Sequence, residues 1–356
     1  MRAVALAGTV AAVFCLLALH TAQACDVVAA PGGETADAAC PILSDGLNTF
    51  PNRCWSIYPP ESRRRFRLSI LPEAEGERAL SVKLKKKDPP NNDGKHKHEV
   101  RVATPLRCGF DGTVWYSFAF SIEGDFSNQD TRWVIGQWKD DTDDSPFLAQ
   151  RFNRGVFYIT VEERRRDLPP GSDDPQRTVR RVIAFGPGYT STSAPFLTER
   201  FISDFRIRNP LASIEPVFRP NTEPAIDDYD LGALEKTLND PPPETFPFLE
   251  DAQAYGNERQ IRIYPSLNPL LPDPTKGLVH MRYRVSMKRD GMSEIDVWAN
   301  GRYIVSVDGM LGGPDAGGPT RYFKFGHYRD IEDDGFDWSK IYLDDFRRGP
   351  TEADVE

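Results

Sequence analysis

Near the C-terminus, one strand-like stretch combines a cation, phenols and core-forming rings. It reads Tyr322-Phe323-Lys324-Phe325-Gly326-His327-Tyr328-Arg329. Because side chains alternate along a strand, Tyr322, Lys324 and Tyr328 share one face, and His327 shares the other, core-facing side with the two phenylalanines. A cation flanked by phenols can neutralise a substrate carboxylate and move a proton through tyrosine. Taken alone, the segment is better explained by an ordinary half-buried strand with amphipathic tyrosines.

Three other runs place basic or aromatic side chains on one strand face. By the same alternation, the groups are Lys97, Glu99 and Arg101; Trp133, Gln137 and Lys139; and His280, Arg282, Arg284 and Lys288. If these faces converge, a chain of net charge −9 acquires one basic, ring-lined surface that suits an anionic polysaccharide, with Trp133 as the sugar-stacking platform. Alternating Lys and Arg also mark ordinary solvent-facing sheet positions. The negative net charge argues against nucleic acid as a partner.

The composition predicts an all-β protein. Short alternating runs are separated by many of the 30 prolines and 27 glycines, and convincing helical periodicity is scarce. So many strands indicate a sandwich or jelly roll, and we expect a concanavalin-like β-jelly roll of two stacked antiparallel sheets with few short helices. We expect a monomer. The predicted divisions are an N-terminal disulfide-bearing segment at 25–60 and the jelly roll at 61–350, with a proline-rich excursion at about 209–274 that includes one short helix at 230–238.

Residues 1–24 have the regions of a secretory signal peptide. Arg2 precedes an apolar run from Val4 to Leu19, and Ala22-Gln23-Ala24 supplies the small residues before a cleavage site. The sequence therefore predicts export to the periplasm or the extracellular space. No later segment is long and apolar enough to predict a membrane span. A lipid anchor on Cys25 is the less favoured alternative, because Ala22 stands where leucine is usual.

Four cysteines follow the predicted signal peptide, namely Cys25, Cys40, Cys54 and Cys108. An even number in an oxidising compartment predicts two disulfides, and of the three connectivities we expect neighbour pairing, Cys25 with Cys40 and Cys54 with Cys108. The chain has no CxxC or HExxH motif, so we expect no metal site. The aspartates between 140 and 144 are interpreted as a solvated acidic turn.

Three of these segments together resemble a known family. Lys97-His98-Glu99-Val100-Arg101, Gln137-Trp138-Lys139 and the segment from Tyr322 to Tyr328 fall in the order of the signature strands of jelly-roll polysaccharide lyases. In alginate lyases those strands read Arg-Ser-Glu-Leu-Arg, Gln-Ile-His and Tyr-Phe-Lys-Ala-Gly-x-Tyr. The Phe-Gly-x-Tyr-Arg form, with Val297-Trp298-Ala299-Asn300-Gly301 and Tyr342-Leu343-Asp344-Asp345-Phe346, is more similar to the heparin lyase I and glucuronan lyase group.

The resemblance implies β-elimination within an anionic polysaccharide of the alginate, glucuronan or glycosaminoglycan type, without a cofactor. Elimination removes the C5 proton of a uronate, which becomes acidic enough only when the adjacent carboxylate is neutralised or hydrogen-bonded. Arg101, Gln137 and Lys324 match the neutralising positions, and Tyr328 matches the catalytic tyrosine. An ordinary tyrosine pKa lies near 10, so cationic neighbours are needed for Tyr328 to act as a base.

Lys139 stands where the family has histidine. An ordinary lysine is protonated at pH 7 and cannot accept a proton there. Three hypotheses remain open. Tyr328 serves as both base and acid with Lys139 as a neutraliser; His280 replaces the missing base; or catalysis is lost and the protein only binds polysaccharide.

A glycoside hydrolase is a further alternative. Glu294-Ile295-Asp296 resembles the start of the Glu-Ile-Asp-x-x-Glu strand of jelly-roll hydrolases, in which carboxylates act as nucleophile and acid. The second glutamate is missing here, so we interpret both carboxylates as exposed charges before a hairpin turn at Asn300-Gly301.

Overall fold

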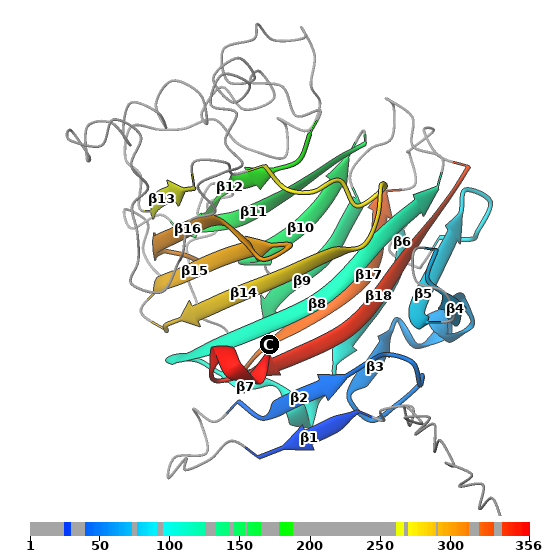
Figure 1. Cartoon of the computed structure of the whole chain (residues 1–356), viewed down its shortest axis with the longest axis horizontal. Helices are drawn as coiled ribbons and strands as arrows, with labels where there is room; N and C mark the ends of the chain where they lie inside the picture. Colours follow the sequence, from blue (N-terminus) through cyan, green and yellow to red (C-terminus); the bar gives the residue numbers. More distant parts are fainter. Residues whose placement is uncertain are drawn as a thin grey trace, which may run out of the picture.

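The structure is a computed structural model, and two stacked antiparallel sheets make up the part of the chain that it describes. That part comprises residues 25–29, 40–72, 77–90, 95–124, 133–141, 146–153, 155–164, 178–187, 261–266, 270–289, 291–312, 320–330 and 337–356. Figure 1 shows the strands of both sheets running along one diagonal of the view. The predicted all-β jelly roll is confirmed.

The larger sheet, sheet A, carries both the N-terminal and the C-terminal strands of the described chain. Its strands are β1 (Asp26–Val28), β2 (Ile42–Asp45), β4 (Phe66–Ile70), β5 (Arg78–Lys85), β8 (Gly112–Gly124), β13 (Ile261–Pro265), β14 (Val279–Met287), β15 (Met292–Ala299), β16 (Arg302–Met310) and β18 (Trp338–Gly349). They are ordered β1-β2-β18-β8-β14-β15-β16-β13, with β5 beside β18 and β4 beside β5. Along β14 every second side chain is buried, as expected for a sheet with one face against the core.

The second sheet, sheet B, brings together three strands that are far apart in sequence. Its members are β3 (Trp55–Tyr58), β6 (Lys95–Val102), β7 (Cys108–Gly109), β9 (Trp133–Asp140), β10 (Leu148–Asn153), β11 (Val156–Arg164), β12 (Thr178–Phe185) and β17 (Thr320–Asp330). The order is β12-β11-β10-β9-β17-β6-β3, with β7 beside one end of β17. Short 3-10 helices are η1 (Pro60–Arg65), η2 (Thr104–Leu106) and η6 (Glu352–Asp354).

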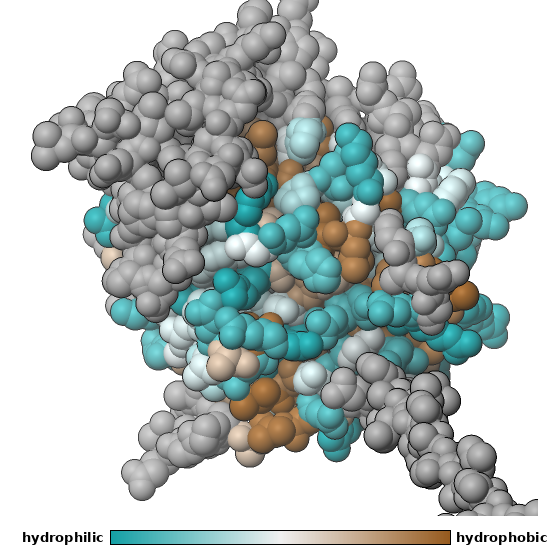
Figure 2. All heavy atoms as spheres, viewed as in Figure 1, coloured by the Kyte–Doolittle hydropathy of each residue, from teal (hydrophilic) through white to brown (hydrophobic). Residues whose placement is uncertain are grey.

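Aromatic rings from both sheets fill the space between them. Phe323 of β17 lies 4.7 Å from Trp138 of β9, 5.1 Å from Phe118 of β8 and 5.5 Å from Phe346 of β18, measured between ring centroids. All four rings are buried, and such rings contribute several kcal/mol each, roughly, through the apolar area they remove from water. Because Phe323 is fixed in the core, the alternate residues of β17 must face away from it. Figure 2 shows hydrophilic side chains over much of the described surface on the face seen in Figure 1.

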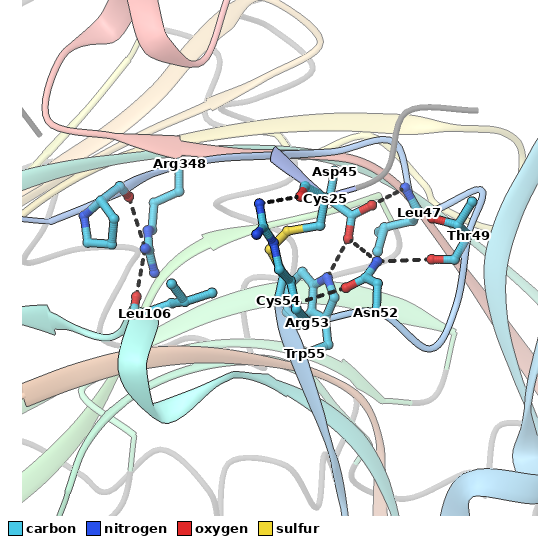
Figure 3. Close-up of a disulfide and its surroundings, with 11 residues drawn as sticks. Cys25, Asp45, Leu47, Thr49, Asn52, Arg53, Cys54, Trp55, Leu106 and Arg348 are labelled. Carbon is cyan, nitrogen blue, oxygen red and sulfur yellow. Dashed lines mark hydrogen bonds between the residues drawn. A yellow bond between two sulfur atoms is a disulfide. The ribbon is translucent and has the colours of Figure 1, made fainter. Parts of the chain in front are cut away.

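The two disulfides are crossed, so the predicted neighbour pairing is wrong. Cys25 pairs with Cys54 and Cys40 pairs with Cys108. Sheet pairing is the reason, because β1 and β2 lie in sheet A while β3 leads into sheet B, and this brings cysteines distant in sequence together. Figure 3 shows the first bridge beside a buried network in which Asp45 accepts hydrogen bonds from its neighbours.

Several predicted segments can be placed only in part. The predicted 25–60 segment supplies β1 and β2 to sheet A and β3 to sheet B. The end of the proline-rich excursion supplies β13, whereas the predicted signal peptide and the short helix at 230–238 lie outside the described residues. Among the described helices, none has the length and apolar character needed to cross a membrane.

Candidate active site on sheet B

The three signature strands are direct neighbours in sheet B, in the order β9-β17-β6 (Figure 1). Their register forms a single row across the sheet, in which Lys324 of β17 is opposite Arg101 of β6 on one side and Gln137 of β9 on the other. Directly opposed residues of an antiparallel pair point to the same face. Three side chains from three distant segments therefore project together from the face that is turned away from the core.

Glu99 ties this row together. Its carboxylate accepts one hydrogen bond from the Gln137 amide and another from the Lys324 ammonium, whose Nζ lies 3.1 Å from Glu99 Oε2. Glu99 is fully buried, and Lys324 is nearly so. A buried carboxylate that accepts two hydrogen bonds holds both donors in place, and each donor keeps further N–H groups for a ligand.

Tyr328 lies two same-face positions along β17 from Lys324, opposite Lys97 of β6, and beside two ammonium groups. The Nζ atoms of Lys97 and Lys95 lie 4.9 Å and 5.5 Å from the centre of its ring. Gly326 allows the backbones of β17 and β6 to lie close together beside Tyr328. It has φ +145°, and a Cβ added there would lie 2.2 Å from the backbone oxygen of His98 on β6. The glycine of the motif is thus required by the close contact between β17 and β6.

His327 points into the core, as its parity with the two phenylalanines predicted. Its ring is stacked on Trp133 with 4.3 Å between centroids, and its Nε2 lies 3.0 Å from the backbone oxygen of Val82. Burial lowers the pKa of His327 to about 3, so the ring is neutral near pH 7. His98, directly opposite on β6, is also buried and has a pKa lowered to about 4, mainly by burial. Neither histidine lies on the face of sheet B that carries Arg101, Gln137 and Lys324.

Trp133 is in the core as well, so its predicted place on the sugar-binding face is wrong. It is fully buried, and its indole N–H donates to the backbone oxygen of Gly326 at 3.1 Å. The pairing of β9 with both neighbours shifts register between Val134 and Gly136. This irregularity reverses the alternation, so Trp133 no longer shares a face with Gln137.

Lys139 and Tyr322 lie on the same face of sheet B, one same-face position beyond Gln137 and Lys324. They are opposed residues of β9 and β17. Burial lowers the pKa of Lys139, and the neighbouring Lys324 lowers it further. Burial also raises the pKa of Tyr322, against the effect of Arg107, whose guanidinium carbon lies 4.0 Å from the centre of the Tyr322 ring. Arg107 is itself paired with Asp141.

His280, Arg282 and Arg284 do not join this face, so the predicted convergence is wrong for β14. This strand belongs to sheet A, and the three side chains lie on its outer face, with the aromatic core between them and sheet B. Arg282 pairs with Glu352 at 2.8 Å, and Arg284 pairs with Asp296 at 2.6 Å. Strand parity had identified the outer face correctly but could not identify the sheet.

The carboxylates considered for a hydrolase are occupied by the same arginine. Arg284 pairs with Glu294 as well as with Asp296, each at 2.6 Å, on the outer face of sheet A. Glu294 is half-buried and Asp296 is buried, so the interpretation of both carboxylates as exposed charges is wrong for Asp296.

Tyr58 belongs to the basic face and was missed from the sequence. It lies on β3, opposite Glu99 of β6. Its ring centre is 4.9 Å from the guanidinium carbon of Arg101 and 5.0 Å from Nζ of Lys97. The alternation of Trp55-Ser56-Ile57-Tyr58 is a weak strand signal, and it was overlooked because the segment was interpreted as a disulfide-bearing extension. We call Tyr58, Lys97, Glu99, Arg101, Gln137, Lys139, Tyr322, Lys324 and Tyr328 the basic face.

A family model described as polysaccharide lyase matches residues 53–187. The matched segment contains β3, β6 and β9 of the basic face, and it confirms the resemblance on which the motifs had been interpreted. No curated protein sequence matches the chain significantly.

Solved structures of lyases are among those similar to this one. An endo-β-1,4-glucuronan lyase from the fungus Trichoderma reesei is 13% identical, with a TM-score of 0.40 over 82% of this chain and 90% of that chain. An alginate lyase from Klebsiella pneumoniae is 10% identical, with a TM-score of 0.40 over 92% of this chain and 95% of that chain. Alginate lyase A1-II', a member of polysaccharide lyase family 7, is 13% identical, with a TM-score of 0.38 over 80% and 83%.

Proposed function

We propose that this protein, a polysaccharide lyase by the match over residues 53–187, is exported and cleaves a uronate-containing anionic polysaccharide by β-elimination on its basic face. The observation that carries the proposal is the row formed by Arg101, Lys324 and Gln137, whose backbones are in register across three strands. Two cations and an amide in one row form a site for a carboxylate, because each offers N–H donors to the same region.

The reaction follows from the chemistry of a uronate bound there. When the row neutralises the carboxylate, the C5 proton becomes acidic and the developing negative charge is stabilised. Tyr328, entering as phenolate, takes the C5 proton. The C4–O4 bond then breaks with its electron pair on O4, a C4=C5 double bond forms, and the same tyrosine returns the proton to O4. The ammonium groups of Lys97 and Lys95 lie 4.9 Å and 5.5 Å from the centre of the Tyr328 ring, beside the group that moves the proton.

Lys139 acts in this scheme as a neutraliser beside the row. It is half-buried and lies close enough to Lys324 for each positive charge to disfavour the other. An anionic substrate relieves that repulsion, so binding a carboxylate there is favoured. The substitution of lysine for the family histidine also favours the second candidate, a protein that binds anionic polysaccharide without cleaving it.

The compartment is part of the proposal. The two disulfides join cysteines that follow the predicted signal peptide, and disulfides of this kind persist in oxidising compartments. Mass spectrometry of the protein from the culture supernatant or periplasm is expected to find Cys25 as the first residue. A retained N-terminus starting at Met1 would contradict export by signal-peptide cleavage.

The test is ultraviolet absorbance of the mature protein incubated with alginate, glucuronan, hyaluronan, heparin or heparan sulfate. Elimination creates an unsaturated uronate that absorbs, so a rise on at least one glycan is expected. Tyr328→Phe is expected to lower the rate by at least about 10³-fold, since base and acid are removed together. Tyr303→Phe, the same change on the outer face of sheet A, is the matched control and should keep the activity.

Absence of a rise on all five glycans would contradict the lyase proposal. Gel retardation of the protein by the same glycans would then identify the binding protein, and absence of retardation would exclude both candidates for these glycans.

A further inference from the structure

Tyr58 is the residue of the basic face that none of the sequence motifs includes. It ends β3 and is half-buried, with its side chain on the same face as Glu99 and Arg101 of the adjacent β6. The other face of β3 is occupied by Trp55, which packs edge-on against Phe346 with 4.8 Å between ring centroids. The anchoring of β3 to the core therefore comes from Trp55, and the ring of Tyr58 is available for another role.

Three cations surround the Tyr58 ring. The distances to its centre are 4.9 Å for Arg101, 5.0 Å for Lys97 and 5.8 Å for Lys324, all within the range of cation–π attraction. The Lys97 ammonium is in addition 4.9 Å from the ring of Tyr328, so it lies between the two tyrosines.

The position of the Tyr58 ring counteracts both the repulsion between these cations and the mobility of their side chains. Three like charges on neighbouring strands repel one another, and long lysine and arginine side chains have many rotamers to lose when a ligand fixes them. The negative face of an aromatic ring attracts all three cations, and for Lys324 it adds to the hydrogen bond donated to Glu99. The three side chains therefore start from a restricted position when an anionic ligand binds.

We infer that Tyr58 is a positioning residue of the active site, holding Lys97 against Tyr328 and Arg101 beside the carboxylate-binding row. The inference rests on the proposed lyase function for its catalytic consequence, while the positioning itself is a property of the free protein. Tyr58 touches neither the C5 proton nor O4 in this scheme and is not a catalytic residue.

Two substitutions at Tyr58 separate the ring from its hydroxyl. Tyr58→Leu removes the ring and is expected to lower kcat/KM about tenfold, through a lower kcat and a higher KM, because both Tyr328 and the carboxylate site are affected. Tyr58→Phe restores the ring and should recover kcat/KM to within about threefold. Trp338→Leu is the matched control. It removes a ring on sheet A whose centre lies 3.9 Å from the Lys83 ammonium, and it should leave kcat/KM unchanged.

A second readout does not depend on lyase activity. Crystal structures of the free variants locate the Lys97 ammonium, which lies 4.9 Å from the centre of the Tyr328 ring in this structure. In Tyr58→Leu the ammonium is expected to leave the range of cation–π attraction to Tyr328, which ends at about 6 Å, while in Tyr58→Phe it should stay in place.

The position of Lys97 decides the inference whatever the glycan assays show. A Lys97 ammonium that leaves the Tyr328 ring in Tyr58→Leu and stays beside it in Tyr58→Phe supports positioning even if no glycan is cleaved. A Lys97 ammonium that stays in place in Tyr58→Leu would overturn the inference. If Tyr58→Leu fails to fold, Tyr58→Phe still tests the role, because displacement of Lys97 by loss of the hydroxyl alone would also overturn it.

Discussion

Strands β6 and β14 carry similar patterns of residues and have different surroundings in the sandwich. Each alternates cationic side chains on one face with core side chains on the other. On β14, Arg282 and Arg284 face carboxylates at 2.8 Å and 2.6 Å. On β6, Lys97 and Arg101 lie over the ring of Tyr58. Carboxylate partners neutralise a cation, whereas an aromatic ring holds it and leaves its charge. On the β6 face the Glu99 carboxylate binds Lys324, and the ring of Tyr58 lies beside Lys97 and Arg101.

Exchanging one arginine on each strand gives the largest expected difference. Arg101→Ala is expected to lower kcat/KM by about 10²-fold to 10³-fold, the typical cost of removing one preorganised donor from an active site. Arg282→Ala, on the outer face of sheet A, should change it by less than about twofold. Steady-state kinetics on the cleaved glycan measures both. Equal losses would remove the distinction between the two faces.

Substitution of Lys139 sharpens the comparison within sheet B. Lys139→Met is expected to lower kcat about tenfold, because one of several neutralising groups is lost while Tyr328 still moves the proton. A loss as large as that of Tyr328→Phe would instead identify Lys139 as the base. The pH profile of kcat in Lys139→Met separates the same hypotheses. If Lys139 is the base, its loss would remove one of the two pKa values that limit kcat in the wild type.

The buried histidines of sheet B predict that the stability of the protein depends on pH. His98 and His327 have folded pKa values lowered to about 4 and about 3, against 6.5 for an ordinary histidine. Below pH 6.5 the unfolded chain binds protons that the folded protein does not, so stability is full above that pH and falls as the pH drops toward 4.

At pH 5, each buried histidine is expected to lower the free energy of unfolding by up to about 2 kcal/mol relative to pH 7. Urea unfolding at the two pH values measures the loss. His98→Gln should reduce the pH dependence, and His280→Gln, at an exposed position, should leave it unchanged. A wild type equally stable at both pH values would show that these rings are protonated without cost.

The smallest effect is expected on β14 itself. His280→Ala should leave kcat and its pH dependence unchanged, because the imidazole lies on the outer face of sheet A and cannot reach a substrate on sheet B. A lost acidic limb in the pH profile of this variant would restore His280 as the base and contradict the separation of the two faces.

Predictions from the sequence succeeded where local alternation decides the answer. Phe323, Phe325 and His327 were expected in the core and are buried there, while Tyr322, Lys324 and Tyr328 face away. The same argument failed for Trp133, because a register shift in β9 reverses the alternation at one residue, and irregularities of this kind leave little trace in a single sequence.

Pairing between distant segments accounts for the other errors. The disulfides are crossed because β1 and β2 lie in one sheet and β3 lies in the other. Tyr58 was missed for a related reason, since nothing in the four residues of β3 indicates that Lys97 and Arg101 will lie beside them.

The sequence by itself determined the all-β fold, the two faces of each strand and the residue types of the basic face, because these depend on alternation and composition over a few neighbouring residues. The tertiary structure alone decided that β6, β17 and β9 are neighbours, that β14 lies in the opposite sheet and that Tyr58 lies beside Lys97 and Arg101. The physical reason is that strand order and register are fixed by packing and hydrogen bonding between segments hundreds of residues apart, and a strand's own side chains specify its face without specifying its neighbour.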